Sequence, residues 1–221
     1  MSDPSSHQPP VLGRRAFSGA LMLSPWVVAL SGPAQAAGAA VGLRAPGFSA
    51  PDTSGTVRQL SDFKGKLVVL EWTNTGCPFV RKHYTGNGAG NMQRLQKEFT
   101  ARGVVWLAIN STESASSEYL APAGVDRWMS EKQAAPTATL IDESGQTGHL
   151  YGAKTTPHMY IISPQGLLLY AGAIDSIASA RVDDIKLATN YVRQGLNEAL
   201  AGKALSVAST RPYGCSVQYK A

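Results

Sequence analysis

Two cysteines are the residues of this chain best suited to chemistry. Cys77 ends a polar turn that follows the apolar run at positions 67–72, and Pro78 comes directly after it. Because proline is well tolerated in a first helical turn, where its missing N–H has no partner to lose, this order predicts that Cys77 stands at the start of a helix. Free amide groups and the helix dipole favour a thiolate there. Cys77 is therefore the candidate nucleophile, and Cys215 is the second cysteine of the chain.

Charged residues surround the predicted helix start. Arg81 follows Cys77 by about one helical turn, and Lys82 and His83 come next and are expected to add positive potential there. A permanently charged guanidinium favours a nearby thiolate and can contact a substrate oxygen, so Arg81 is a candidate catalytic residue. A solvated arginine on the helix face is the alternative. Glu71 is unusual within an apolar run, since burying a carboxylate is costly. It is either a proton relay for Cys77 or a strand-end group that reaches solvent.

Length and composition limit the classes of function that this chain can have. The chain has 221 residues, is 43% hydrophobic and carries a formal net charge of +5. This length and composition suit one domain with a sizeable core. Lys and Arg are scattered and form no basic stripe, so we expect no nucleic-acid partner. His83, His149 and His158 share no metal-ligand spacing, and the Trp and Tyr residues suit packing better than a cofactor site. We therefore expect neither a metal nor a cofactor.

Residues 1–36 have the pattern of an export signal. Arg14 and Arg15 precede an apolar stretch at positions 20–30, and Ala34-Gln35-Ala36 ends the segment. Paired arginines, a short apolar segment and a small-x-small ending resemble a twin-arginine signal. We expect cleavage after Ala36, a periplasmic or otherwise exported protein, and no stable membrane span after cleavage. An uncleaved anchor is the alternative.

The remaining chain divides into three parts. Residues 37–42 read as a small-residue linker, residues 43–204 as one domain, and residues 205–221 as an irregular, mobile tail that carries Cys215. Strands that alternate with helices predict an α/β fold with a largely parallel sheet, a final antiparallel hairpin and helices on both faces. The expected elements are a hairpin within 43–66, strands at 67–72, 104–109, 138–141, 158–162 and 167–171, and helices from position 77, at 92–101, 117–133 and 146–151, and through Ile185, Ala188, Val192 and Leu196.

Four segments carry a family resemblance. They are positions 72–81 (WTNTGCPFVR), 105–111 (VWLAINS), 154–158 (KTTPH) and 212–215 (PYGC). Together with the order of elements, they resemble the thioredoxin fold, and more narrowly the peroxiredoxin-like redoxin family of alkyl hydroperoxide reductases and thiol-specific antioxidant proteins. The resemblance covers positions 42–219.

The resemblance implies a cofactor-free thiol oxidoreductase, either thiol peroxidase-like or a thiol–disulfide oxidoreductase. Cys77 would attack a hydroperoxide or a protein disulfide, and an extracytoplasmic thiol would be the reductant. Pro157 would be cis and lie against Cys77, while Thr156 would offer backbone hydrogen bonds to a partner peptide. A trans proline that opens an edge strand is the alternative. Thr73, Thr75 and Pro78 complete the predicted substrate-binding residues.

Two departures from the family pattern limit the mechanism. Thioredoxin-type oxidoreductases carry a second cysteine three residues after the first, where this chain has Val80. Peroxiredoxins usually carry Thr or Ser three residues before the reactive cysteine, where this chain has Asn74. An Asn amide can donate a hydrogen bond to a peroxide, and Thr73 and Thr75 flank it.

Cys215 is the candidate resolving thiol. After peroxide attack, Cys77 would become a sulfenic acid that condenses with a second thiol to form a disulfide. Three alternatives stay open at this stage: a cycling Cys77–Cys215 bond, a permanent bond, and an unpaired surface thiol. A permanent bond would suit a non-catalytic binding module that holds an extracytoplasmic partner around Pro157.

Overall fold

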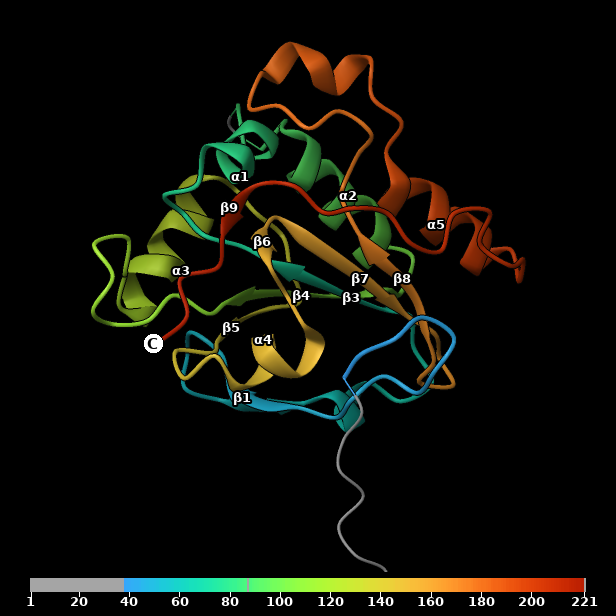
Figure 1. Cartoon of the computed structure of the whole chain (residues 1–221), viewed down its shortest axis with the longest axis horizontal. Helices are drawn as coiled ribbons and strands as arrows, with labels where there is room; N and C mark the ends of the chain where they lie inside the picture. Colours follow the sequence, from blue (N-terminus) through green and yellow to red (C-terminus); the bar gives the residue numbers. More distant parts are fainter. Residues whose placement is uncertain (1–37, 87, 221) are drawn as a thin grey trace, which may run out of the picture. The chain divides into compact units, whose positions relative to one another are not determined.

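The centre of the fold is a five-stranded mixed sheet in the order β5-β4-β3-β7-β8 (Figure 1). The computed structural model describes residues 38–86 and 88–220, so the predicted signal at 1–36 lies outside it. Strand β3 (Val68–Trp72) is central and buried along its whole length. It runs parallel to β4 (Val105–Asn110) and antiparallel to β7 (His158–Ile162). Burial on both faces explains why these strands are mostly apolar in the sequence.

The two outer strands complete the sheet as predicted. Strand β5 (Ala138–Ile141) lies parallel to β4, and β8 (Leu168–Gly172) lies antiparallel to β7. The hairpin of β7 and β8 therefore adds antiparallel pairing to a parallel β3-β4-β5 unit.

Helices cover one face of the sheet. Val69 and Trp106 point into a cluster with residues of α1 (Pro78–His83), α2 (Asn91–Thr100) and α5 (Tyr191–Leu200). Helix α3 (Pro122–Glu131) adds Met129 to the same cluster. Cys77 belongs to this layer as well.

The opposite face has a thinner cover. Leu70 and Leu107 pack there with residues of α4 (Gln146–Tyr151). A hairpin of β1 (Ser49–Pro51) and β2 (Val57–Gln59), followed by the 3-10 helix η1 (Leu60–Phe63), lies over the same layer. The expected α/β architecture with helices on both faces is confirmed.

Two predicted helices are shorter in the structure. The helix expected at 117–133 begins only at Pro122, because proline disfavours a helical conformation in the preceding residue; Ala121 has ψ 156°. The prediction of one long closing helix is also wrong, since η2 (Val182–Lys186) is a separate 3-10 helix. Asn190 starts α5 anew by accepting a hydrogen bond from the backbone N–H of Arg193 at 2.8 Å.

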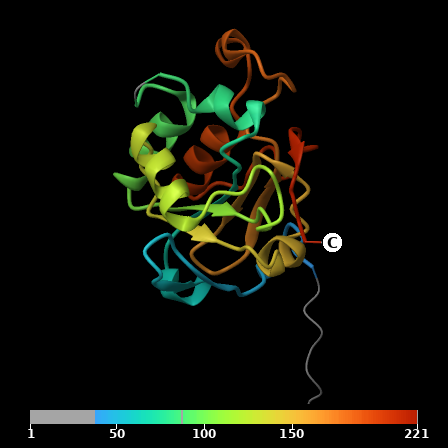
Figure 2. The same cartoon turned by 90° about the vertical axis from the view of Figure 1, so that its left-hand side faces the viewer.

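The tail contains a short strand that was not predicted. Strand β9 (Cys215–Ser216) pairs antiparallel with the short β6 (Thr155–Thr156). Figure 2 shows this red segment at one margin of the domain. The expected linker is also in contact with the domain, since the Ala39 N–H donates to the Leu150 carbonyl at 3.2 Å. Within residues 38–86 and 88–220, no helix combines the length and the apolar character needed to cross a membrane.

Candidate active site

Cys77 stands at the start of α1, as predicted. Its backbone N–H donates to the Asn74 carbonyl at 3.2 Å, and its own carbonyl accepts from Arg81 N–H at 2.9 Å. Pro78 occupies the first helical turn. The Cys77 side chain is fully buried, whereas Pro78 beside it is exposed. The polar turn after β3 therefore delivers the sulfur to a covered position at the carboxyl end of the central strand.

A cis proline lies next to the sulfur. The Thr156–Pro157 peptide bond is cis, which confirms the expectation from the resemblance. The Cys77 Sγ lies 3.1 Å from the Thr156 carbonyl oxygen. The Thr156 side-chain hydroxyl is buried and has no hydrogen-bond partner among the described residues.

Cys215 lies directly over Cys77. The two Sγ atoms are 2.8 Å apart, and both thiols are free in this structure. A disulfide bond is about 2.05 Å long, so a small movement would join them. Burial first, then the hydrogen bond with Cys77 and the negative charges of Cys77 and Glu118, raise the pKa of Cys215 to about 12. Cys215 therefore keeps its proton at neutral pH.

Gly214 allows this close approach. Its φ is +140°, and a Cβ built there would lie 2.0 Å from the Thr156 carbonyl oxygen. No side chain fits at that distance, so glycine is needed for the tail to lie on β6.

Asn74 is occupied by the protein itself. Its amide nitrogen donates to Glu118 Oε2 at 2.7 Å and to Thr112 Oγ1 at 3.3 Å. Its oxygen accepts from the Gly76 N–H at 2.6 Å. These bonds fix the turn before Cys77, and donation to a peroxide would require one of them to break. Glu118 was not among the predicted site residues, because the sequence placed it inside a helix.

Arg81 and the threonines also hold the turn. Arg81 is exposed, and its Nε donates to the Thr75 carbonyl at 2.8 Å. Thr75 is itself buried, and the Thr73 hydroxyl is buried without a hydrogen-bond partner in the part of the chain that the structure describes. Arg81 thus stabilises the segment between β3 and Cys77.

Glu71 is fully buried on the same face of β3 as Val69. The alternative that Glu71 is a strand-end group that reaches solvent is therefore wrong. Its carboxylate accepts from Tyr84 Oη at 2.7 Å, Trp106 Nε1 at 2.7 Å and Gln96 Nε2 at 3.1 Å. Burial raises its pKa to about 7, although the three donors act in the opposite direction. A carboxyl group that titrates near neutrality is suited to proton transfer.

The side chains of Lys82 and His83 are buried and contact Asp175, whereas the sequence placed them as positive charges near Cys77. Lys82 Nζ lies 3.4 Å from Asp175 Oδ2, and His83 Nε2 lies 3.7 Å from the same atom. Burial and the neighbouring Lys82 charge lower the pKa of His83 to about 3. His83 is therefore neutral and adds no positive potential at Cys77, contrary to the prediction. Asp175 and Tyr213, which complete this cluster, were not predicted.

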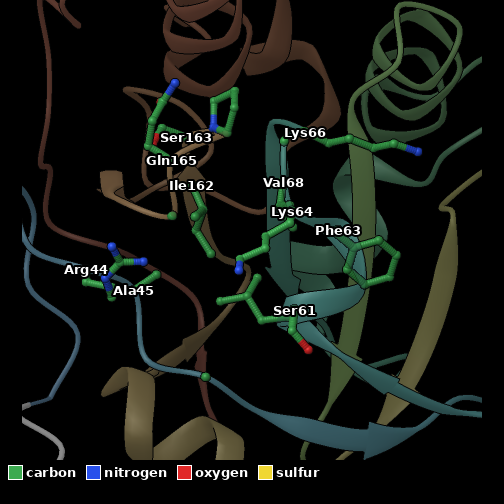
Figure 3. Close-up of a pocket in the computed structure, with 15 residues that line it drawn as sticks. Arg44, Ala45, Ser61, Phe63, Lys64, Lys66, Val68, Ile162, Ser163 and Gln165 are labelled. Atoms are coloured by element: carbon green, nitrogen blue, oxygen red, sulfur yellow. The ribbon is translucent and has the colours of Figure 1, made fainter.

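A basic cavity lies at the other end of the sheet. It has a volume of about 760 Å³ and is lined by residues from the start of β3 and the end of β7, including Val68 and Ile162. Figure 3 shows Arg44 and Lys64 reaching toward it from opposite sides. Cys77 follows the far end of β3, so this cavity does not serve the cysteine pair. In residues 38–86 and 88–220, no three His, Cys, Asp or Glu side chains are placed to hold a metal ion.

A match to a family model shows to which protein family this chain belongs. The model of the AhpC/TSA family matches residues 41–171, which is more than half of the sequence. The chain belongs to the AhpC/TSA family. The match includes Cys77 and Pro157 but ends before Asp175, Tyr213 and Cys215.

Two curated relatives come from Bacillus subtilis. The thiol-disulfide oxidoreductase ResA is 29% identical over 127 residues, which are 57% of this chain and 63% of the relative. The thioredoxin-like protein YneN is 31% identical over 127 residues, or 58% of this chain and 68% of the relative. The matched segment thus spans less than two thirds of ResA.

Solved structures establish the fold. An uncharacterized conserved protein from Geobacillus kaustophilus matches with a TM-score of 0.68 and 24% identity, over 82% of this chain and 93% of the other. A thiol:disulfide interchange protein from Bacteroides sp. matches with a TM-score of 0.51 and 21% identity, over 74% and 95%. The predicted thioredoxin-like fold is confirmed.

Proposed function

We propose that this protein is an exported, thiol-dependent oxidoreductase in which Cys77 is the nucleophile and Cys215 the resolving thiol. The observation that carries the proposal is the 2.8 Å separation of the two sulfur atoms beside cis-Pro157. Family membership and the similarity to a thiol-disulfide oxidoreductase support the same chemistry. The paired arginines and small-x-small ending within residues 1–36 support export and removal of that segment.

With a protein disulfide as substrate, the reaction has two exchange steps. The Cys77 thiolate attacks one sulfur of the partner, so a mixed disulfide forms and the other partner sulfur leaves as a thiolate. Cys215 loses its proton and attacks the Cys77 sulfur. The Cys77–Cys215 bond forms, and the second partner sulfur leaves. The partner gains two electrons, and an extracytoplasmic thiol then reduces the Cys77–Cys215 bond.

With a hydroperoxide as substrate, the Cys77 thiolate attacks the terminal peroxide oxygen. The O–O bond breaks, an alcohol leaves after taking up a proton, and Cys77 becomes a sulfenic acid. Cys215 then displaces the hydroxyl group as water, and the same disulfide results. Asn74 and Arg81 support this branch less directly, since both are bonded to the turn.

Glu71 supports either branch as a proton store. Cys215 must lose its proton before it attacks, and its raised pKa makes that loss unfavourable without a base. Glu71 titrates near pH 7 in the same buried layer as Cys77. We propose that it takes part in this transfer.

Single cysteine variants of the exported protein test the proposal. Insulin serves as the disulfide probe, hydrogen peroxide as the peroxide probe and dithiothreitol as the reductant. Cys77→Ser should lower turnover about a thousandfold or more, because the nucleophile is lost. Cys215→Ser, reduced beforehand and then assayed without dithiothreitol, should still complete one stoichiometric reaction, leaving a mixed disulfide with the disulfide probe or a sulfenic acid with peroxide. Full activity of Cys77→Ser with both probes would end the proposal.

A non-catalytic binding module is the second candidate. The pairing of β9 in the tail with β6 favours it, since a resolving thiol is expected to move. In that case Cys77 and Cys215 would form a permanent bond that glutathione at millimolar concentration leaves intact. Mass spectrometry after thiol trapping distinguishes a cycling bond from a permanent one.

A further inference from the structure

Helix α1 carries a buried cation that the proposed chemistry does not use. The Lys82 side chain is inaccessible to solvent, and its Nζ lies 3.4 Å from Asp175 Oδ2 and 3.2 Å from the Ile177 carbonyl. Taking two charges out of water costs several kcal/mol per ion before their attraction is counted. Ordinary surface charge does not explain such a pair.

Tyr213 connects this ion pair to the tail. Its hydroxyl donates to Asp175 Oδ1 and lies 3.4 Å from Lys82 Nζ. Its ring packs edge-on against Phe79, with 5.9 Å between ring centroids. Phe79 follows Cys77 by two residues, and Tyr213 precedes Cys215 by two residues. The contact therefore joins the two segments that carry the sulfurs.

The tail is also held after Cys215, but by a different kind of contact. The Tyr219 hydroxyl donates to the Ala153 carbonyl at 2.8 Å, and its ring stacks on His149 at 4.1 Å. This contact involves a neutral backbone acceptor just after α4 and no residue of α1. The two tyrosines thus offer a matched pair, one bonded to a buried charge and one to the backbone.

We propose that Lys82, Asp175 and Tyr213 form a clamp that positions Cys215 against Cys77 and so sets the strength of the bond between them. The inference rests on the proposed function and deepens it. Bringing two groups together within one chain raises their effective concentration. The clamp raises the effective concentration of Cys215 at Cys77, whereas the Tyr219 contact holds the end of the tail. All three are positioning residues.

The first measurement is the equilibrium of the full exported protein with glutathione. One oxidised glutathione takes two electrons from the two thiols, which gives the Cys77–Cys215 bond and two reduced glutathione molecules. Tyr213→Phe removes the hydroxyl and keeps the ring on Phe79, whereas removing Asp175 would leave Lys82 unpaired. We expect the equilibrium constant to fall about tenfold in Tyr213→Phe, as for loss of a hydrogen bond to a charged group, and to change less than about twofold in Tyr219→Phe.

The second measurement is the rate at which iodoacetamide alkylates Cys77 in the reduced proteins, since the tail covers this sulfur. Tyr213→Phe should react about tenfold faster than the parent and Tyr219→Phe at the parental rate. Equal values for Tyr213→Phe and the parent in both assays would overturn the clamp, and so would equal losses in the two tyrosine variants. If the parent forms no bond that glutathione can exchange, the proposed function fails, and the alkylation rates alone decide the clamp.

Discussion

Glu71 and Asp175 are both buried acids with partners on the segment around α1, but the partners differ in charge. Tyr84, Gln96 and Trp106 surround Glu71 and are all neutral donors. Asp175 has the ammonium group of Lys82 beside it and accepts from Tyr213. Lys82 and Tyr84 are only two residues apart, so successive positions of one segment serve the two acids.

The difference explains what each acid can do. A carboxylate among neutral donors loses water without gaining a counter-ion, which raises the pKa of Glu71 to about 7 and leaves it able to exchange a proton near neutrality. A carboxylate beside a buried ammonium has its charge balanced and can anchor a distant segment. One acid is therefore suited to proton transfer and the other to holding the tail.

The largest expected effect is on the ion pair. Asp175→Asn leaves the Lys82 charge buried without a counter-ion, which should lower the free energy of unfolding by about 3–5 kcal/mol. Urea unfolding at pH 7 measures this loss. Asp183→Asn is the control, since its partner Lys186 and Asp183 itself are exposed, and it should change stability by less than about 0.5 kcal/mol.

The double variant Lys82→Met, Asp175→Asn sharpens the test. Because it removes the unpaired charge, it should recover at least about half of the loss. If Asp175→Asn unfolds with a free energy within about 1 kcal/mol of the parent, Lys82 does not depend on Asp175 as a counter-ion. The contrast between the two acids would then fail.

The second effect is the pH dependence that Glu71 contributes. Its folded-state pKa of about 7 lies above its ordinary value of 4.5. The stability it contributes is therefore fully present below pH 4.5 and lost as the pH rises to about 7, by about 3 kcal/mol in total. Relative to Glu71→Gln, the parent should lose this amount between pH 4.5 and pH 8 in urea unfolding of the reduced protein. Parallel pH profiles for the two proteins would contradict the raised pKa.

The smallest effect concerns His83, which lies next to Asp175 but is not its counter-ion. The pKa of His83 is lowered to about 3, and the Asn91 amide lies 3.0 Å from its Nδ1. If that amide donates, the ring is neutral and carries its proton on Nε2. Long-range ¹H–¹⁵N spectra of His83 should therefore not change between pH 5 and pH 8. A titration midpoint in that interval would make His83 a second cation of the cluster.

Local patterns were enough to find the segment that carries the candidate nucleophile. The apolar run, the polar turn and Cys77-Pro78 predicted a strand followed by a helix start, and β3 and α1 confirm both. The starts of two helices were predicted less accurately. The helix at 117–133 and the closing helix were extended too far, because apolar spacing does not reveal where Pro122 or the cap at Asn190 starts a helix.

The second half of the site could not be located from spacing. Asp175 belongs to no motif, Tyr213 stands in the segment 212–215 without a predicted role, and Lys82 reads as a surface cation when only its helix is considered. Their meeting depends on how the segment after β8 and the tail fold back onto α1. The family resemblance covered positions 42–219 but assigned no role to Asp175 or Tyr213, and the family model itself ends at residue 171.

The sequence by itself determined the thioredoxin-like order of elements, the placement of Cys77 at a helix start and the absence of a neighbouring cysteine at Val80. These are properties of short segments, where residue types and backbone preferences act over a few positions. The tertiary structure alone decided that Cys215 lies over Cys77, that Glu71 is enclosed by neutral donors and that a buried ion pair contacts Tyr213 of the tail. Such contacts join residues that are far apart in the chain, and only the packing of the whole domain brings them together.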